Sequence, residues 1–201
     1  MRTLLLPAAA RPWRQRLAQL GLAWCAAVFA VLACAAQHAQ AEATASGPSL
    51  ERRVKAAFLY KFLGYTEFPA SAFADPASPI TILVSGSDEM VAELAALTAG
   101  RSVNSRAIVV RALRETEPAL AHLLFVAGSD CARAGRVIRA VRALLVVTEC
   151  DTGPQQGSVI NFRIVDEHVR FDVSLEAADS NGVKLSSRLL TVANHVQKGA
   201  P

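Results

Sequence analysis

Cysteine and histidine are the residue types in this chain that are best suited to redox or metal chemistry. After residue 41 the sequence holds Cys131, Cys150, His122, His168 and His195. The histidines show no i, i+4 spacing and no Cys-x-x-Cys motif accompanies them, so the sequence does not support a metal site. It also lacks the G-x-S-x-G turn that presents a catalytic serine. We therefore expect no metal, no cofactor and no enzymatic activity.

Residues 1–41 have the features of a secretory signal peptide that is cleaved after export. Four arginines (Arg2, Arg11, Arg14 and Arg16) lead into an uncharged, apolar run over 17–36, and Ala39-Gln40-Ala41 fits a cleavage site. Two alternatives stay open. The apolar run is close to the roughly 20 residues that span a membrane, and Val31-Leu32-Ala33-Cys34 resembles a lipobox, which would make Cys34 a lipidated N-terminus. Residues 42–49 are expected to form a short linker.

Removing this segment changes what the charge of the protein implies. The whole chain has a net charge of +4, but without the first 41 residues it retains 17 basic and 17 acidic residues. A neutral mature protein gives no support to nucleic-acid binding, which needs a basic surface. About 160 residues remain, which is enough for one domain with a substantial core.

Export to an oxidising compartment favours a disulfide between Cys131 and Cys150. Cys131 begins the helix after the third predicted strand, and Cys150 follows the fourth. The carboxyl ends of neighbouring parallel strands lie on one edge of a sheet, so the two sulfur atoms could meet there. A cysteine at a helix start could instead be a reactive thiol of low pKa, which leaves a thiol-based enzyme as the minor alternative.

Short apolar segments alternate with helical ones between residues 50 and 148. We expect helices over 50–65, 88–97 and 131–142, and strands over 80–84, 107–112, 122–126 and 144–148. This alternation is typical of βα units that build a largely parallel sheet with helices on both faces. The predicted fold class is therefore α/β, with a single three-layer domain.

Residues 157–196 are expected to close this domain. Period-2 alternation in 160–164 and in 169–173, on either side of the polar turn Asp166-Glu167-His168, predicts an antiparallel hairpin at the edge of the sheet. The register would pair Ile160 with Val173, Phe162 with Phe171 and Ile164 with Val169, and would bring Arg163 within reach of Asp172. A C-terminal helix extending to about Val196 should then cover the apolar face of the hairpin.

The hairpin and the first helix also resemble a known family. Phe171-Asp172-Val173-Ser174, Ala177-Ala178 and Val183-Lys184-Leu185-Ser186-Ser187-Arg188-Leu189-Leu190 resemble the C-terminal signature of the YfiR family. A second match is formed by Val54-Lys55-Ala56-Ala57-Phe58-Leu59-Tyr60-Lys61-Phe62 with Thr66-Glu67-Phe68-Pro69. The resemblance covers residues 50–198, which would form one YfiR-like domain.

This resemblance implies a periplasmic regulator. Such a protein binds an inner-membrane diguanylate cyclase through the periplasmic sensor part of the enzyme and represses it, linking envelope or redox signals to cyclic di-GMP and biofilm formation. A second copy of the chain, in a homodimer, is a further candidate partner. The alternative is a periplasmic small-molecule-binding module without catalytic activity, which would use the aromatic first helix.

Two regions offer the aromatic and apolar anchors on which protein interfaces depend. One is Tyr65 and Phe68, at the end of the first helix. The other is the hairpin tip around Val165, Glu167 and Val169, where an edge strand is available to a partner. Relatives commonly have tryptophan where this chain has Phe68, so the resemblance implies only a packing role for Phe68.

Overall fold

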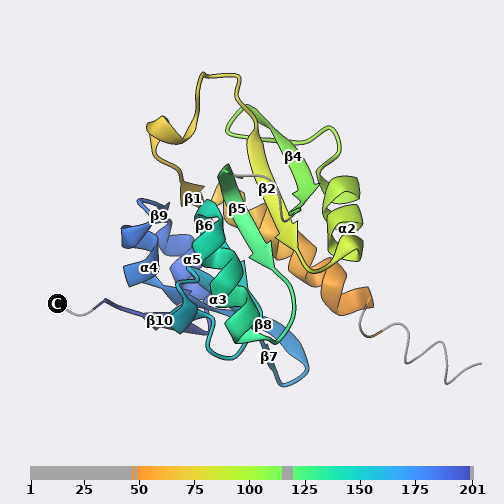
Figure 1. Ribbon diagram of the computed structural model, residues 1–201, viewed down its shortest axis with the longest axis vertical. Helices are drawn as coiled ribbons and strands as arrows, with labels where there is room; N and C mark the ends of the chain where they lie inside the picture. The colour runs from red at the N-terminus through yellow and green to blue at the C-terminus, as the bar shows by residue number, and fades with distance from the viewer. Residues whose placement is uncertain (1–46, 48, 115–119, 200–201) are drawn as a thin grey trace, which may run out of the picture. The chain divides into compact units, whose positions relative to one another are not determined.

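The computed structural model describes residue 47 and residues 49–114 and 120–199, and the domain that begins at Leu50 is described by itself (Figure 1). The predicted signal peptide, Cys34 and nearly all of the predicted linker lie outside the described residues. The main sheet has the strand order β10 (His195–Gln197), β8 (His168–Ser174), β7 (Ile160–Val165), β6 (Arg142–Thr148), β5 (Leu120–Val126), β2 (Ile80–Ser85), β4 (Arg106–Ala112) and β3 (Ser102–Val103).

Five neighbouring strands of this sheet, β7, β6, β5, β2 and β4, run parallel to one another. Strand β8 is antiparallel to β7, and β3 is antiparallel to β4. A separate antiparallel pair joins β1 (Thr66–Glu67) to β9 (Lys184–Leu185). The largely parallel sheet with a C-terminal antiparallel hairpin, which the sequence predicts, is therefore confirmed.

Helices cover both faces of the sheet. The first helix (residues 49–64) and α2 (Asp88–Thr98) share one apolar cluster with the side chains of Ile82 and Val84. On the opposite face, α3 (Cys131–Ala140) packs against Leu83 and its neighbours in a second cluster. Successive strand side chains point to opposite faces, so β2 contributes to both clusters. The shorter helical segments are η1 (Ala70–Ala72), η2 (Pro154–Gln156), α4 (Leu175–Ser180) and α5 (Ser187–Val192).

Side-chain caps define where α2 and α3 begin. The hydroxyl of Ser87 accepts a hydrogen bond from the backbone N–H of Met90 at 3.1 Å, and the carboxylate of Asp130 accepts one from that of Arg133 at 2.9 Å. Both bonds satisfy N–H groups that the helix itself leaves unpaired. The sequence prediction placed the start of each helix correctly for this reason.

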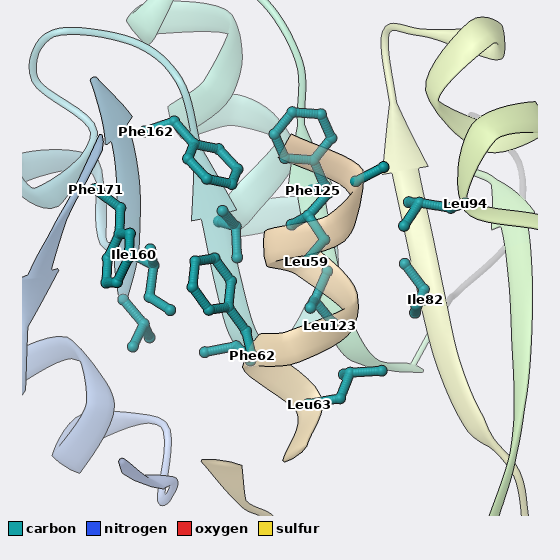
Figure 2. Packing of buried hydrophobic residues seen from close by; sticks show 14 of the residues in the cluster. Leu59, Phe62, Leu63, Ile82, Leu94, Leu123, Phe125, Ile160, Phe162 and Phe171 are labelled. Atoms are coloured by element: carbon teal, nitrogen blue, oxygen red, sulfur yellow. The ribbon is translucent and has the colours of Figure 1, made fainter. Parts of the chain in front are cut away.

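Four phenylalanine rings join the first helix to the terminal hairpin, and Figure 2 labels Phe62, Phe162 and Phe171 among them. Phe62 lies 5.0 Å from Phe171 and 5.8 Å from Phe162, and Phe58 lies 5.5 Å from Phe171, measured between ring centroids. These distances fall in the range in which aromatic pairs attract. The predicted hairpin register, with Phe162 opposite Phe171, is confirmed, and it places the two hairpin rings side by side against the helix.

Two predictions for the C-terminal region are wrong. The predicted helix ends early, because α5 stops at Val192 and residues 195–197 form β10, which pairs in parallel with β8. Arg163 lies opposite Arg170 and pairs with Asp151 at 3.7 Å, whereas Asp172 accepts a hydrogen bond from the side chain of Asn194 at 2.8 Å. Strand β10 thus covers the edge of β8. Asn194, which directly precedes β10, contacts Asp172 in the place where Arg163 was expected.

The loop before β2 is held against the sheet by His122 and Arg106. The Nδ1 atom of His122 accepts a hydrogen bond from the backbone N–H of Thr81 at 3.0 Å, which assigns the imidazole proton to Nε2, 3.2 Å from the carbonyl oxygen of Ala72. The ring stacks on Phe73 with a centroid distance of 4.5 Å. Arg106 donates to the carbonyl oxygens of Asp75 and Ser78 on the same loop.

This environment favours a neutral imidazole. Burial lowers the pKa of His122 below its ordinary value of 6.5, and the positive charge of Arg106 lowers it further, against a smaller opposing effect of the Ala72 carbonyl. The unfolded chain therefore binds a proton more readily than the folded chain. The contribution of His122 to stability is present above pH 6.5 and is lost as the pH falls below that value.

We expect the free energy of unfolding to decrease between pH 7 and pH 5 by a smaller amount in a His122→Gln variant than in the wild type, because glutamine does not titrate. Denaturant unfolding at several pH values measures this difference. His168→Gln is the matched control, since His168 is exposed on the hairpin. An identical pH dependence in all three proteins would contradict the assigned role of His122.

Candidate functional site

The hairpin tip is an exposed two-residue turn between β7 and β8. Asp166 and Glu167 have φ values of 49° and 61°, a left-handed backbone that matches the twist of a tight hairpin. The side chain of Glu167 is exposed, and those of Val165 and Val169 are half-buried. Ile164 is 53% exposed, which makes it an apolar residue of this surface that sequence reasoning assigned to the buried face. Its exposure arises because the hairpin extends past the core.

Part of β8 remains an open strand edge beside this tip. Strand β10 pairs with Asp172–Ser174, and the backbone N–H of Asn194 donates to the carbonyl oxygen of Phe171. Among the described residues no strand pairs with the outer side of His168–Arg170. The open strand edge that the sequence predicts is therefore restricted to His168–Arg170, the residues of β8 that are nearest to the turn.

Tyr65 and Phe68 have different surroundings. The side chain of Tyr65 is 37% exposed, while its backbone carbonyl accepts a hydrogen bond from Ser186. The ring of Phe68 packs edge-on against His122 at 5.7 Å and Phe73 at 6.4 Å. The ring of Phe68 is thus occupied by contacts within the domain, and Tyr65 has fewer such contacts.

These two regions lie near opposite ends of the parallel strands. Phe68 contacts His122, which lies near the start of β5. Val165 ends β7, which is parallel to β5 through β6. The hairpin tip thus lies at the edge where the parallel strands end, which we call the carboxyl edge, whereas Phe68 lies at the other edge. The predicted partner-binding residues do not form one continuous patch.

A buried ion pair at the carboxyl edge was missed by sequence reasoning. The carboxylate of Glu149, directly after β6, accepts hydrogen bonds from the Nζ of Lys55 and from the backbone N–H of Gly128. Lys55 is only 8% exposed and also pairs with Glu51. Burial by itself would lower the pKa of Lys55, but the hydrogen bonds and charges of Glu149 and Glu51 outweigh it and raise that pKa. The first helix, β6 and the β5–α3 loop are joined at this point.

Cys131 and Cys150 lie within disulfide-bonding distance at the same edge. Their Cα atoms are 5.4 Å apart, inside the range that a disulfide allows. Cys150 is buried, and the backbone N–H of Thr152 lies 3.3 Å from the sulfur of Cys131. The expectation that a shared strand edge brings the two sulfur atoms together is confirmed.

The three histidines are far from forming one site. His122 is buried, whereas His168 and His195 are exposed on the hairpin and on β10. In the part of the chain that the structure describes, no three His, Cys, Asp or Glu side chains are grouped so that they could hold a metal ion. Within the same residues, no helix is long and apolar enough to cross a membrane.

The fold is thus an α/β domain in which helices cover both faces of a largely parallel sheet. A model of the YfiR/HmsC-like family matches residues 52–194, and the chain belongs to that family. The match extends from the first helix to the end of α5, so it includes both regions that carry the resemblance. No curated protein matches the chain.

Removing either cysteine should destabilise the oxidised protein. A disulfide that closes a loop of about 20 residues contributes roughly 3 kcal/mol in the chain-entropy model. We expect Cys131→Ala, Cys150→Ala and the double variant to lose similar amounts of unfolding free energy, because one bond is lost in each case. Denaturant unfolding with and without a thiol reductant measures these losses.

The double variant is the control for this experiment, because its stability should not respond to the reductant. Losses that add up in the double variant, or two free thiols on alkylation of the protein purified under non-reducing conditions, would contradict a disulfide.

Proposed function

We propose that this protein is a periplasmic regulator that binds an inner-membrane diguanylate cyclase through the sensor part of the enzyme and represses it, and that it has no turnover of its own. The observation that carries the proposal is the family match over residues 52–194, since the YfiR/HmsC-like family suggests a regulator of diguanylate cyclase signalling. Envelope or redox signals would release the cyclase and raise cyclic di-GMP inside the cell. A homodimer is a second assembly that the proposal includes.

The hairpin tip is the better supported contact surface for this role. It combines the exposed side chains of Ile164 and Glu167 with the unpaired start of β8. An apolar residue beside a charge and an open strand edge can be buried together by a partner strand. Tyr65 remains a second candidate, at the other edge of the sheet.

The alternative of a ligand-binding module on the aromatic first helix receives less support. Phe62 is 1% exposed, and Phe58 packs with it against the hairpin rings. Because Phe62 is enclosed in the core, it cannot also line an open groove, and Phe58 is partly covered by the same contacts.

Export is part of this proposal, with residues 1–41 as the cleaved signal peptide and 42–49 as the linker. We expect the mature protein to begin at Glu42, because Ala39-Gln40-Ala41 fits the cleavage site. Mass spectrometry of the intact protein from a periplasmic fraction measures the terminus. An uncleaved chain in the inner membrane would contradict export with cleavage, and a diacylated Cys34 would replace the soluble form with a lipoprotein.

Charge reversal at the hairpin tip should release the cyclase without unfolding the regulator. We expect Glu167→Lys to raise cyclic di-GMP towards the level of a deletion strain, because loss of an interface anchor costs about 2 kcal/mol, or roughly 30-fold in affinity. Tyr65→Ala tests the other edge in the same way. Cyclic di-GMP, protein level and thermal midpoint should be measured in the same strains.

Asp179→Lys and Val109→Ala are the matched controls. Asp179 is an exposed acid on α4, and Val109 is 38% exposed, close to the value for Tyr65. Both should retain wild-type cyclic di-GMP. The regulator proposal fails if deletion of the whole gene leaves cyclic di-GMP and biofilm unchanged under several envelope stresses.

A further inference from the structure

A groove lined by arginines lies beside α3, on the face of the sheet away from the first helix. Its lining includes Arg114, Arg133 and Arg136, with Leu113, Val137 and Val141 as apolar surface. The hollow measures about 540 Å³, within the roughly 300–1,000 Å³ of small-molecule sites. We call it the arginine groove. Neither candidate partner-binding region contributes to its lining.

The groove lies where the direction of chain winding reverses. After β2 the chain turns at Gly86 into α2 on one face, and after the adjacent β5 it turns at Gly128 into α3 on the other. Both glycines have positive φ, 88° and 99°. In open α/β sheets, ligands bind outside the carboxyl ends of the strands at such a reversal. Ser85 and Gly86 bring this position into the lining of the arginine groove.

Arg133 is held rigidly at the base of the groove. Its guanidinium donates to the carbonyl oxygen of Ala127 and to the hydroxyl of Ser85, both at 3.0 Å. A Cβ atom on Gly86 would lie only 2.7 Å from Nη2 of Arg133, so glycine permits the guanidinium to lie against the backbone. This arginine links the ends of β2 and β5 and keeps its charge in the groove.

The other two arginines have charges that no described residue neutralises. Among the described residues, Arg114 and Arg136 have neither a hydrogen bond nor an ion pair. Glu115 and Glu117, which follow Arg114 in the sequence, lie outside the described residues. Of the described acids, Asp130 caps α3, and Asp88 begins α2 on the opposite face. Cations gathered in a concave site attract anions and increase their local concentration. Guanidinium groups are also well shaped to bind carboxylate or phosphate through two hydrogen bonds.

We propose that the arginine groove binds a small organic anion, with its phosphate or carboxylate group between Arg136, Arg114 and Arg133 and its apolar part on Leu113, Val137 and Val141. The apolar lining distinguishes this site from a surface that attracts only inorganic ions. The site goes beyond the proposed regulatory function, and its test does not depend on a cyclase.

The test is isothermal titration calorimetry on the protein purified from the periplasm. Phenyl phosphate and benzoate supply an anion with an aromatic ring, inorganic phosphate supplies the anion alone, and phenol supplies the ring alone. We expect binding of at least one organic anion with one site per chain, at least tenfold tighter than inorganic phosphate or phenol. The affinity should fall as salt is added, because the groove is open to screening.

The variant pair for this test removes two charges in each member. Arg114→Gln with Arg136→Gln should weaken binding at least tenfold. Arg170→Gln with Arg188→Gln should leave it unchanged, because both of these arginines are exposed and lie outside the groove lining. Circular dichroism and the thermal midpoint establish that both double variants are folded.

Two results would overturn the inference. One is that neither phenyl phosphate nor benzoate binds measurably at millimolar concentration. The other is an equal loss of affinity in the two double variants, which would show that net charge alone attracts the anion. Neither result bears on the regulator proposal, which is judged by cyclic di-GMP.

Discussion

The packing of the first helix against the terminal hairpin is the constraint on which the rest of the domain depends. Phe58 and Phe62 come from the start of the domain, and Phe162 and Phe171 come from its end, so their contacts close the chain over the sheet. Strands β1 and β9, which follow the helix and the hairpin respectively, then pair with each other. The two stretches that resemble the YfiR family are therefore one structural unit. A parallel sheet must be covered on both faces, and on one face this unit provides much of the cover.

Features set by local periodicity were predictable from the sequence, and features set by distant partners were not. Strands, caps and hairpin register follow from alternation and from residues such as Ser87 and Asp130. Lys55 carries no local sign of burial, because its partner Glu149 lies 94 residues away. The pairing of β10 with β8 is equally non-local: a helical pattern continues past Val192, but the unpaired edge of β8 provides hydrogen bonds that a longer helix would leave unmade.

The candidate site was predictable in its parts and not in its arrangement. The exposed turn at Asp166 and Glu167 follows from polar residues between two apolar runs, and the meeting of Cys131 with Cys150 follows from the shared ends of parallel strands. The separation of Tyr65 from Glu167 depends on the directions of the first helix and of β7, which no short motif specifies. The arginine groove is similar, since Arg114, which follows β4, and Arg136 on α3 are 22 residues apart in the sequence and are brought to one groove only by the tertiary fold.

The carboxyl edge combines rigidity with exposed surface, and this combination suits binding. The loop that leads into α3 is attached twice, through Gly128 to Glu149 and Lys55, and through Cys131 to Cys150. Helix α3 therefore starts from a fixed position, which also fixes where Arg133 and Arg136 project. Arg133, whose guanidinium is already held by two hydrogen bonds, loses less conformational entropy when a ligand arrives. At the opposite edge the loop around Phe73 is held through His122, whose contact with Thr81 requires a neutral ring. The two edges are thus stabilised by different chemistry, so acidification weakens the attachment through His122 at one edge, whereas the bond between Cys131 and Cys150 at the other does not titrate.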